Sequence, residues 1–358
     1  MICRSDVVSL RRDALRRRLA VSIVAGIGLG IGGVAYATTV TIAVPNNNDL
    51  IEMKKLSPVF EKANPDIQLK WIVLEENVLR QRLTTDITTN GGQFDVAAIG
   101  TYEAPLWGKR GWLVPVTGLP ASYDLERCAQ IGSRRAVVPW DAIRLAVQRR
   151  KLDDLLLQGF IRGGFNENLS LMTSGKCAIW VDATSAAGIL YNKTESSVAD
   201  KVGFAAAPTQ LTPKGAHWLW SWSFAVPKSS NSQDAAKRFI EWSTSKEYIT
   251  LVGNDIGWAS LPPGTRQSTY ARPEYKQAAP FSEFVLNAID TANPNDSTLK
   301  KVPYSGVQYV GIPEFQSFGT LIGQQIAGAL AGQMTVDQAL LAGQAAADRA
   351  VRQAGYPK

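Results

Sequence analysis

Short apolar runs and helical spacings alternate along the first hundred residues, and this order constrains the fold more than any other feature. We expect strands at residues 38–44, 67–73 and 94–99, with helices at 50–60 and 77–89. Two successive strand–helix–strand units with apolar strands are typical of a parallel sheet covered by helices on both faces. The sequence therefore predicts an α/β fold.

Local residues indicate where these helices begin and end. Asn46–Asp49 form a polar turn that can cap the first helix, and Pro58 is expected to kink or restart it. The Gly91-Gly92 pair is expected to close the second helix. Near the C-terminus, Thr335–Gln338 has the pattern of a capping box that opens a last helix ending near Gly355.

The N-terminus has the pattern of a signal peptide. Five arginines between residues 11 and 18 precede an apolar run from Leu19 to Val34, and Ala35-Tyr36-Ala37 then has the small–x–small form of a cleavage site. We expect residues 1–37 to be removed after Ala37 and the mature protein to be periplasmic. A retained membrane anchor is the alternative, and Sec and twin-arginine export are both compatible with the arginines.

Removal of this peptide changes what the charge implies. Residues 1–37 hold six arginines against two aspartates, so the formal net charge falls from +7 to +3. A charge of this origin gives no reason to expect a nucleic-acid partner. Of the cysteines, Cys128 and Cys177 remain, and the sequence leaves open whether they pair. Residues 176–180 have the composition of a buried strand, which favours a core thiol at Cys177.

Trp218, Trp220 and Trp222 alternate with smaller residues. On a strand the three indoles would line one wall, because every second side chain points to the same face. Such a wall is either ordinary core or a platform on which a sugar or polyol stacks. Composition alone favours core, because aromatic residues dominate ordinary cores.

Tyr102 and Glu103 follow the third expected strand directly. Ligands of parallel sheets bind beyond the carboxyl ends of the strands, so both residues are candidate ligand contacts. The alternative is that they only pack the loop.

Several motifs, in this order along the chain, resemble those of family 1 extracellular solute-binding proteins, the periplasmic receptors of sugar-importing ABC transporters. They are Phe60–Pro65, Asp95-Val96, Gly111–Leu113, Leu171–Trp180, Pro227–Ser230 and Asp234–Trp242. Asn166–Asn168, Trp258–Arg266 and Gly311–Phe315 are similar to the branch that binds mannitol, sorbitol and related polyols.

The resemblance implies a two-lobed periplasmic binding protein of type II, with a hinge between its lobes. Residues 38–123 and about 225–300 would form the first lobe, and about 124–224 and 301–358 the second. Ligand would be held between the lobes, and lobe closure would be read by the membrane permease of the transporter. The protein would act as a monomer without a cofactor.

The resemblance also implies a set of ligand-binding residues. Aromatic side chains would stack on the ligand, while carboxylates and amides would bind its hydroxyls. The matching positions are Asn47, Tyr102, Glu103, Asp182, Trp220, Trp222, Tyr309 and Glu314. For each carboxylate, a helix cap or a surface ion pair is the alternative role.

Residues 125–163 do not match the family, whose members run longer here. The segment has eight basic residues against four acidic ones, so it carries the positive charge of the mature chain. It could be a shortened linker, the remainder of an internal deletion or frame change in a former receptor, or a basic patch for an acidic partner. We favour the deletion or frame change, and therefore expect a truncated second lobe, because a lobe without some strands would expose apolar surface.

Two other functional classes remain open. The chain could be a degenerate receptor that binds nothing, or an exported carbohydrate-active enzyme that uses two carboxylates. Against an enzyme, the single histidine, His217, adjoins Trp218, and no nucleophile motif or phosphate loop is recognisable. No cluster of cysteines and histidines has metal-ligand spacing, so neither catalytic nor metal-binding residues are predicted.

Overall fold

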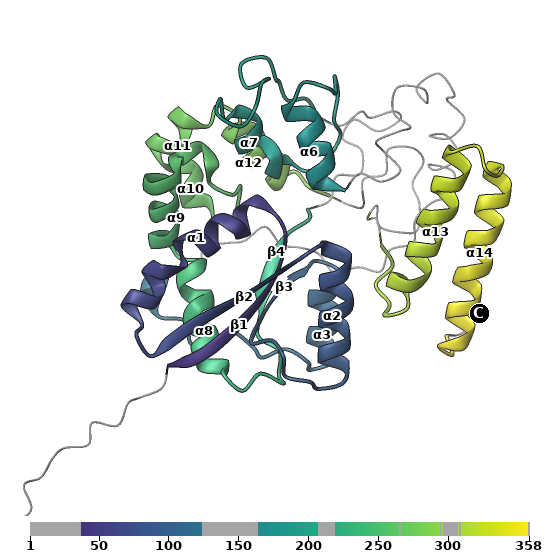
Figure 1. Cartoon of the computed structure of the whole chain (residues 1–358), viewed down its shortest axis with the longest axis horizontal. Helices are drawn as coiled ribbons and strands as arrows, with labels where there is room; N and C mark the ends of the chain where they lie inside the picture. The colour runs from purple at the N-terminus through teal and green to yellow at the C-terminus, as the bar shows by residue number, and fades with distance from the viewer. Residues whose placement is uncertain are drawn as a thin grey trace, which may run out of the picture. The chain divides into compact units, whose positions relative to one another are not determined.

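The computed structural model describes residues 37–123, 164–206, 219–264, 266–293, 295, 307 and 309–356 (Figure 1). The predicted signal peptide up to Tyr36, the unmatched segment 125–163, His217 and Trp218 lie outside these residues. Within the described part of the chain, no helix is both long and apolar enough to cross a membrane.

The strands are β1 (Thr38–Pro45), β2 (Ile67–Leu74), β3 (Val96–Gly100) and β4 (Trp222–Ala225). The helices of the first half are α1 (Asn48–Ala63), α2 (Glu76–Thr88), α3 (Glu103–Lys109), α6 (Phe165–Thr173) and α7 (Ala187–Tyr191). The helices of the second half are α8 (Gln233–Ser243), α9 (Lys246–Val252), α10 (Gln267–Ala271), α11 (Pro273–Ala278), α12 (Ser282–Asp290), α13 (Phe315–Leu330) and α14 (Val336–Gln353).

The four strands form one sheet in the order β2-β1-β3-β4. Strand β1 runs parallel to both β2 and β3, which confirms the predicted parallel sheet. Strand β4 is added antiparallel to β3 and places Trp222 opposite Gly100. Because β4 has only four residues and lies far from β3 in the sequence, the sequence does not indicate that these two strands pair.

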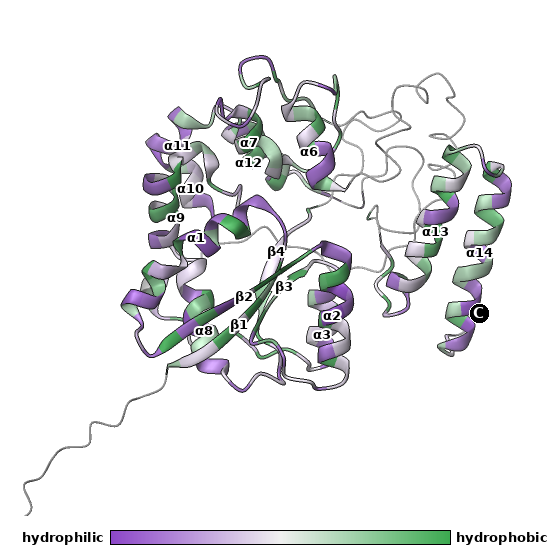
Figure 2. Ribbon diagram, in the orientation of Figure 1, coloured by the Kyte–Doolittle hydropathy of each residue, from purple (hydrophilic) through white to green (hydrophobic). Residues whose placement is uncertain are grey.

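Helices cover both faces of the sheet. On one face, alternate residues of β1, such as Val40 and Ile42, pack with apolar residues of α1 and α8 to α12. On the other face, Ala43 of β1 packs with residues of α2 and α3. Figure 1 shows α2 and α3 on the opposite side of the sheet from α1 and α8, and Figure 2 shows the mainly hydrophobic strands between them. The period of two in each strand supplies both cores.

Helix α1 continues through Pro58, so the expected restart of the helix at this residue is wrong. Pro58 has no N–H to donate to the Lys54 carbonyl, and the Ser57 hydroxyl donates to that carbonyl instead, at 2.8 Å. The cap at Asn47 is confirmed, since its side chain accepts a hydrogen bond from the Leu50 N–H. The capping box of Thr335 and Gln338 is also present at the start of α14.

The buried strand expected at residues 176–180 is wrong. The described sheet contains no strand there, and Ile179 and Val181 are 78% and 73% exposed. Cys177 is a free thiol of intermediate exposure rather than a core thiol. The physical reason is that a strand becomes stable only by pairing with another, and no described strand pairs with this segment.

Asp49, at the start of α1, is a titratable group whose surroundings predict an unusual dependence of stability on pH. Burial raises the pKa of Asp49 to about 7, and the charge of Glu52 adds to the effect. Burial, followed by the charge of Asp49, raises the pKa of both Tyr248 and Tyr275, and the buried Tyr275 hydroxyl has no hydrogen-bond partner among the described residues. The surroundings therefore favour the neutral form of Asp49.

We predict that the folded protein loses stability as the pH rises from about 4 to about 7. The pKa of Asp49 is higher in the folded than in the unfolded chain. The stability that depends on protonated Asp49 is therefore fully present below the pKa of the unfolded chain and is lost as the pH rises through the pKa of the folded chain. The Asp49→Asn variant should exceed the wild type in free energy of unfolding by roughly 1–3 kcal/mol near pH 8, allowing for partial exposure, and by less near pH 5. Denaturant unfolding at both pH values measures this difference.

Asp66→Asn is the matched control. A hydrogen bond from Arg238 lowers the pKa of Asp66, so its contribution is present above the unfolded pKa and is lost only in stronger acid. The Asp66→Asn substitution should change the free energy of unfolding by the same amount near pH 5 and near pH 8. A difference between wild type and Asp49→Asn that is also equal at both pH values would contradict the prediction for Asp49.

Candidate ligand-binding site

Several of the predicted ligand residues lie where the parallel strands end. Asn47 follows β1, Tyr102 and Glu103 follow β3, and Trp222 begins the antiparallel strand β4 at the same edge. In a parallel sheet this carboxyl edge is the usual place for a ligand. The long-range pairing of β4 with β3 thus brings the tryptophans to residues that lie more than a hundred positions earlier in the chain.

Trp220 and Trp222 form a corner rather than the flat wall that strict alternation predicts. Their ring centroids lie 5.7 Å apart and the ring planes meet at 88°. Only Trp222 belongs to β4, because the strand begins there. The Trp220 ring packs so closely on Gly100 that a Cβ atom at this glycine would overlap it. Both tryptophans, hereafter the tryptophan corner, are of intermediate exposure.

Arg80 of α2 occupies the tryptophan corner, and the sequence analysis missed it. Its guanidinium carbon lies 5.1 Å from the ring centroids of both Trp220 and Trp222, within the range of cation–π attraction. The same guanidinium pairs with Glu76 at 2.8 Å and with Glu103. Burial lowers the pKa of Arg80, but the charges and hydrogen bonds of the two glutamates outweigh it and raise the pKa.

A sequence signal for Arg80 did exist. Glu76 and Arg80 have the i,i+4 spacing of a helical ion pair, on the helix that follows the carboxyl end of β2. Such pairs usually lie on solvated surfaces, so the spacing alone did not indicate a site.

Tyr102 connects the edge to the returning segment 309–315. Its hydroxyl donates to the Ile312 carbonyl at 2.6 Å, and its ring packs against Tyr309 with centroids 5.4 Å apart. The Tyr309 hydroxyl donates to the Thr101 carbonyl at 3.2 Å. Burial, followed by the charges of Glu103 and Glu314, raises the pKa of Tyr102, so this hydroxyl stays protonated. The structure thus brings together Tyr102 and Tyr309, two of the predicted ligand residues from distant parts of the chain.

The remaining predicted residues have other immediate partners. The Asn47 side-chain oxygen caps α1, and Glu314 accepts a hydrogen bond from the Tyr356 hydroxyl at 3.1 Å. Asp182 is exposed and accepts a hydrogen bond from the N–H of the adjacent Ala183 at 2.7 Å. No contact described in the structure links Asp182 to the tryptophan corner. A ligand role for these three residues stays a prediction.

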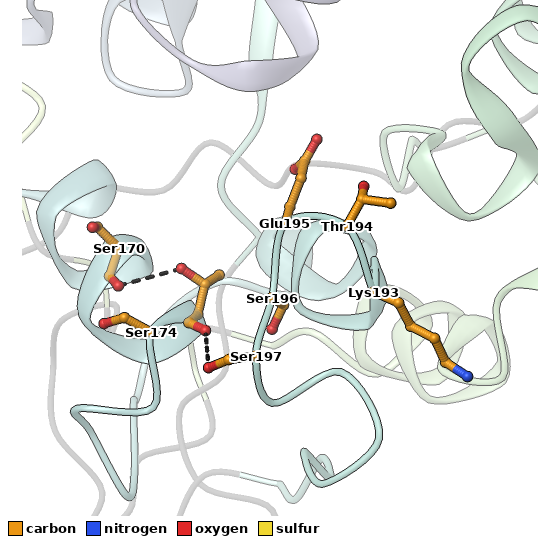
Figure 3. A pocket seen from close by; sticks show the side chains of 8 residues that line it. Ser170, Ser174, Lys193, Thr194, Glu195, Ser196 and Ser197 are labelled. Atoms are coloured by element: carbon orange, nitrogen blue, oxygen red, sulfur yellow. Dashed lines mark hydrogen bonds between the residues drawn. The ribbon is translucent and has the colours of Figure 1, made fainter.

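A separate pocket of about 440 Å³ lies between the end of α6 and residues 193–197 (Figure 3). Hydroxyl side chains dominate its lining, and several already donate to backbone carbonyls, as Ser197 does to Thr173 at 2.8 Å. None of the predicted ligand residues lines this pocket. Among the described residues, no cluster of histidine, cysteine and acidic side chains could hold a metal ion.

The carboxyl edge therefore offers partly exposed aromatic rings beside the buried Arg80–Glu103 ion pair, to which the more exposed Glu76 also contributes. Aromatic faces suit the C–H surfaces of a small ligand, and the polar groups around them can fix its orientation.

Comparisons with known proteins place the chain in a family. The family model described as bacterial extracellular solute-binding protein matches residues 47–152 and 144–250. A mannitol-binding protein of Pseudomonas aeruginosa is 43% identical over a match of 415 residues, which takes in 90% of this chain and 95% of that protein.

Solved structures agree with this assignment. An ABC transporter solute-binding protein from Agrobacterium vitis, with bound D-mannitol, is 38% identical, with a TM-score of 0.74 over 90% of this chain and all of that one. A solute-binding protein from Agrobacterium radiobacter in complex with ribitol shares the fold, with a TM-score of 0.64, 17% identity, and 89% and 98% of the two chains covered.

These relatives bind solutes for ABC transporters and are not enzymes, and their two-lobed α/β fold is the one expected from the motifs. The chain belongs to the family of bacterial extracellular solute-binding proteins.

Proposed function

We propose that this protein is the substrate-binding component of an ABC importer and that its ligand is a sugar alcohol of the mannitol or sorbitol type. The observation that carries the proposal is the tryptophan corner at the carboxyl edge of the sheet, in a chain with 43% identity to a mannitol-binding protein. The D-mannitol-bound relative supports the same ligand class.

The proposed ligand stacks its carbon chain on the exposed parts of the Trp220 and Trp222 rings that Arg80 does not cover. A polyol presents C–H groups between its hydroxyls, so it can use both an aromatic face and hydrogen-bonding groups. Tyr102, Glu103 and Tyr309 form the neighbouring part of the proposed site, and Asn47, Asp182 and Glu314 complete it from the loops around them.

The proposed cellular setting follows from the N-terminus and the family. Signal peptidase would cut after Ala37, and the mature protein would work in the periplasm as a monomer that hands its ligand to the permease. Residues 38–123 and about 225–300 would form the first lobe, and the rest of the mature chain the second. Closure of the two lobes on the ligand would signal the loaded state.

We also propose that the second lobe is shorter than in the relatives. The match to the Pseudomonas aeruginosa protein runs over 415 residues, more than the 358 of this chain, so part of that protein has no counterpart here. The exposure of Ile179 and Val181 supports the loss of their partner strands. The competing proposal is a degenerate receptor that no longer binds ligand.

A thermal melt of the mature protein with mannitol, sorbitol and arabinitol tests the proposed function. A ligand that binds only the folded state stabilises it by about 2.7 kcal/mol at a concentration of 100 times Kd, so one polyol should raise Tm. Calorimetry then gives the affinity. If the protein unfolds cooperatively and none of the three polyols shifts the transition, the polyol-receptor proposal fails. If the protein shows no cooperative transition, the competing proposal of a degenerate receptor is supported.

Gly100 provides a test of the site within the fold. Gly100→Ala should displace the Trp220 ring, because the new Cβ would overlap it, at a cost of about 1–3 kcal/mol in stability. Mannitol affinity, measured by calorimetry, should fall roughly tenfold, equivalent to about 1.4 kcal/mol.

Gly108→Ala is the control for this substitution. Nothing lies near its Cβ position in α3, so an alanine should be neutral or slightly stabilising and leave mannitol affinity unchanged. Equal affinities for Gly100→Ala and Gly108→Ala would place the ligand away from Trp220.

A further inference from the structure

The guanidinium of Arg80 contacts both rings of the tryptophan corner and the carboxylates of Glu76 and Glu103. It lies 5.1 Å from the centroids of Trp220 and Trp222, whose planes are nearly perpendicular. A planar cation in such a corner attracts both ring faces at once. The position of each indole is thereby tied to the position of one side chain on α2.

The other side of the guanidinium is held by two carboxylates. Its Nε and Nη2 atoms donate to Glu76 Oε1 at 3.2 and 2.8 Å, and its Nη1 atom donates to Glu103. Glu103 is itself only 3% exposed, and its second oxygen accepts the Gly100 N–H at 3.0 Å. Arg80 therefore cannot shift without disturbing the end of β3 and the start of α3.

This arrangement differs from an ordinary surface ion pair. The Arg80 side chain is 12% exposed, so both it and Glu103 have lost most of their water. A buried charge is tolerated only where partners hold it, and removing one partner leaves the other uncompensated. Each Glu103 oxygen already accepts one hydrogen bond and the side chain is almost completely buried, so this carboxylate is poorly accessible to a ligand hydroxyl.

We propose that Arg80 is a positioning residue of the ligand site. Its guanidinium holds the two indoles at a right angle and pairs with the Glu103 carboxylate. Glu103 then acts on the ligand through Arg80, by anchoring the guanidinium, rather than by accepting its hydroxyls. The part that concerns ligand affinity rests on the proposed function. The part that concerns the indole geometry does not.

The test uses Arg80→Gln and Arg80→Lys in the full mature chain, with circular dichroism and mannitol calorimetry as readouts. Two indoles in perpendicular contact couple their electronic transitions, and a Trp220→Phe variant identifies the resulting band. Arg80→Gln should lose this band and bind mannitol about tenfold more weakly, the size expected for a lost contact to a charged group. Arg80→Lys keeps the charge but not the planar fork, so it should recover only part of both signals.

Arg82→Gln is the matched control, because Arg82 lies on the same helix and contacts Phe94, away from the tryptophan corner. It should retain the band and the affinity. If Arg80→Gln does not fold, the double variant Arg80→Met, Glu103→Met removes both buried charges together and should fold without the band.

A folded Arg80 variant that keeps both the indole band and the wild-type affinity overturns the proposal. If the wild-type protein binds no polyol, the proposed function fails, yet the band still reports on Arg80. Loss of the band in Arg80→Gln with retention in Arg82→Gln would then support the positioning role alone.

Discussion

Strand β1 is buried on both faces, and the positions of the other sheet elements depend on this burial. Val40, Ile42 and Val44 are fully buried on the side of α1 and α8, while Ala43 is fully buried on the side of α2. A strand enclosed in this way must have partners along both edges, and β2 and β3 supply them in parallel. Because the three strands are parallel, their carboxyl ends lie at the same end of the sheet. The loops that follow these strands therefore lie next to one another there.

Asp95 joins the early sheet to the later part of the chain. One of its carboxylate oxygens accepts the Thr41 N–H at 2.8 Å and the other accepts the Ser230 hydroxyl at 2.7 Å, in a largely buried position. Val114 and Lys228 add backbone bonds between the loop after α3 and the turn after β4. These bonds hold β4 in register against β3, and that register places Trp222 opposite Gly100. The site thus depends on polar contacts made far from it.

The segments around α6, α13 and α14 are held differently. Helix α6 has no buried residue, and α13 and α14 bury few side chains beyond those between them. No described strand covers their exposed apolar residues, such as Leu321 and Leu341, whereas the sheet covers comparable residues of α1 and α8. Burial of apolar area is the main favourable term in folding, so among the described residues the main contribution to stability comes from the core around β1.

Patterns confined to neighbouring residues could be predicted from the sequence. The strand and helix segments of the first hundred residues, the Asn47 cap and the capping box at Thr335 all have signatures that lie within a few positions of the sequence. The carboxyl-edge positions of Tyr102 and Glu103 could be predicted as well, because a parallel sheet places its loops there. The family motifs supplied the fold and the solute-binding role.

Features that depend on distant partners could not be predicted. Residues 176–180 have the composition of a strand but no strand pairs with them, whereas Trp222 becomes a strand residue because β3 offers a free edge. Arg80 belongs to an inconspicuous helical ion pair until folding brings Trp220 and Glu103 to it. Composition and spacing establish which side chains are available, but burial and long-range pairing establish which of them meet, because those energies depend on residues far apart in the chain.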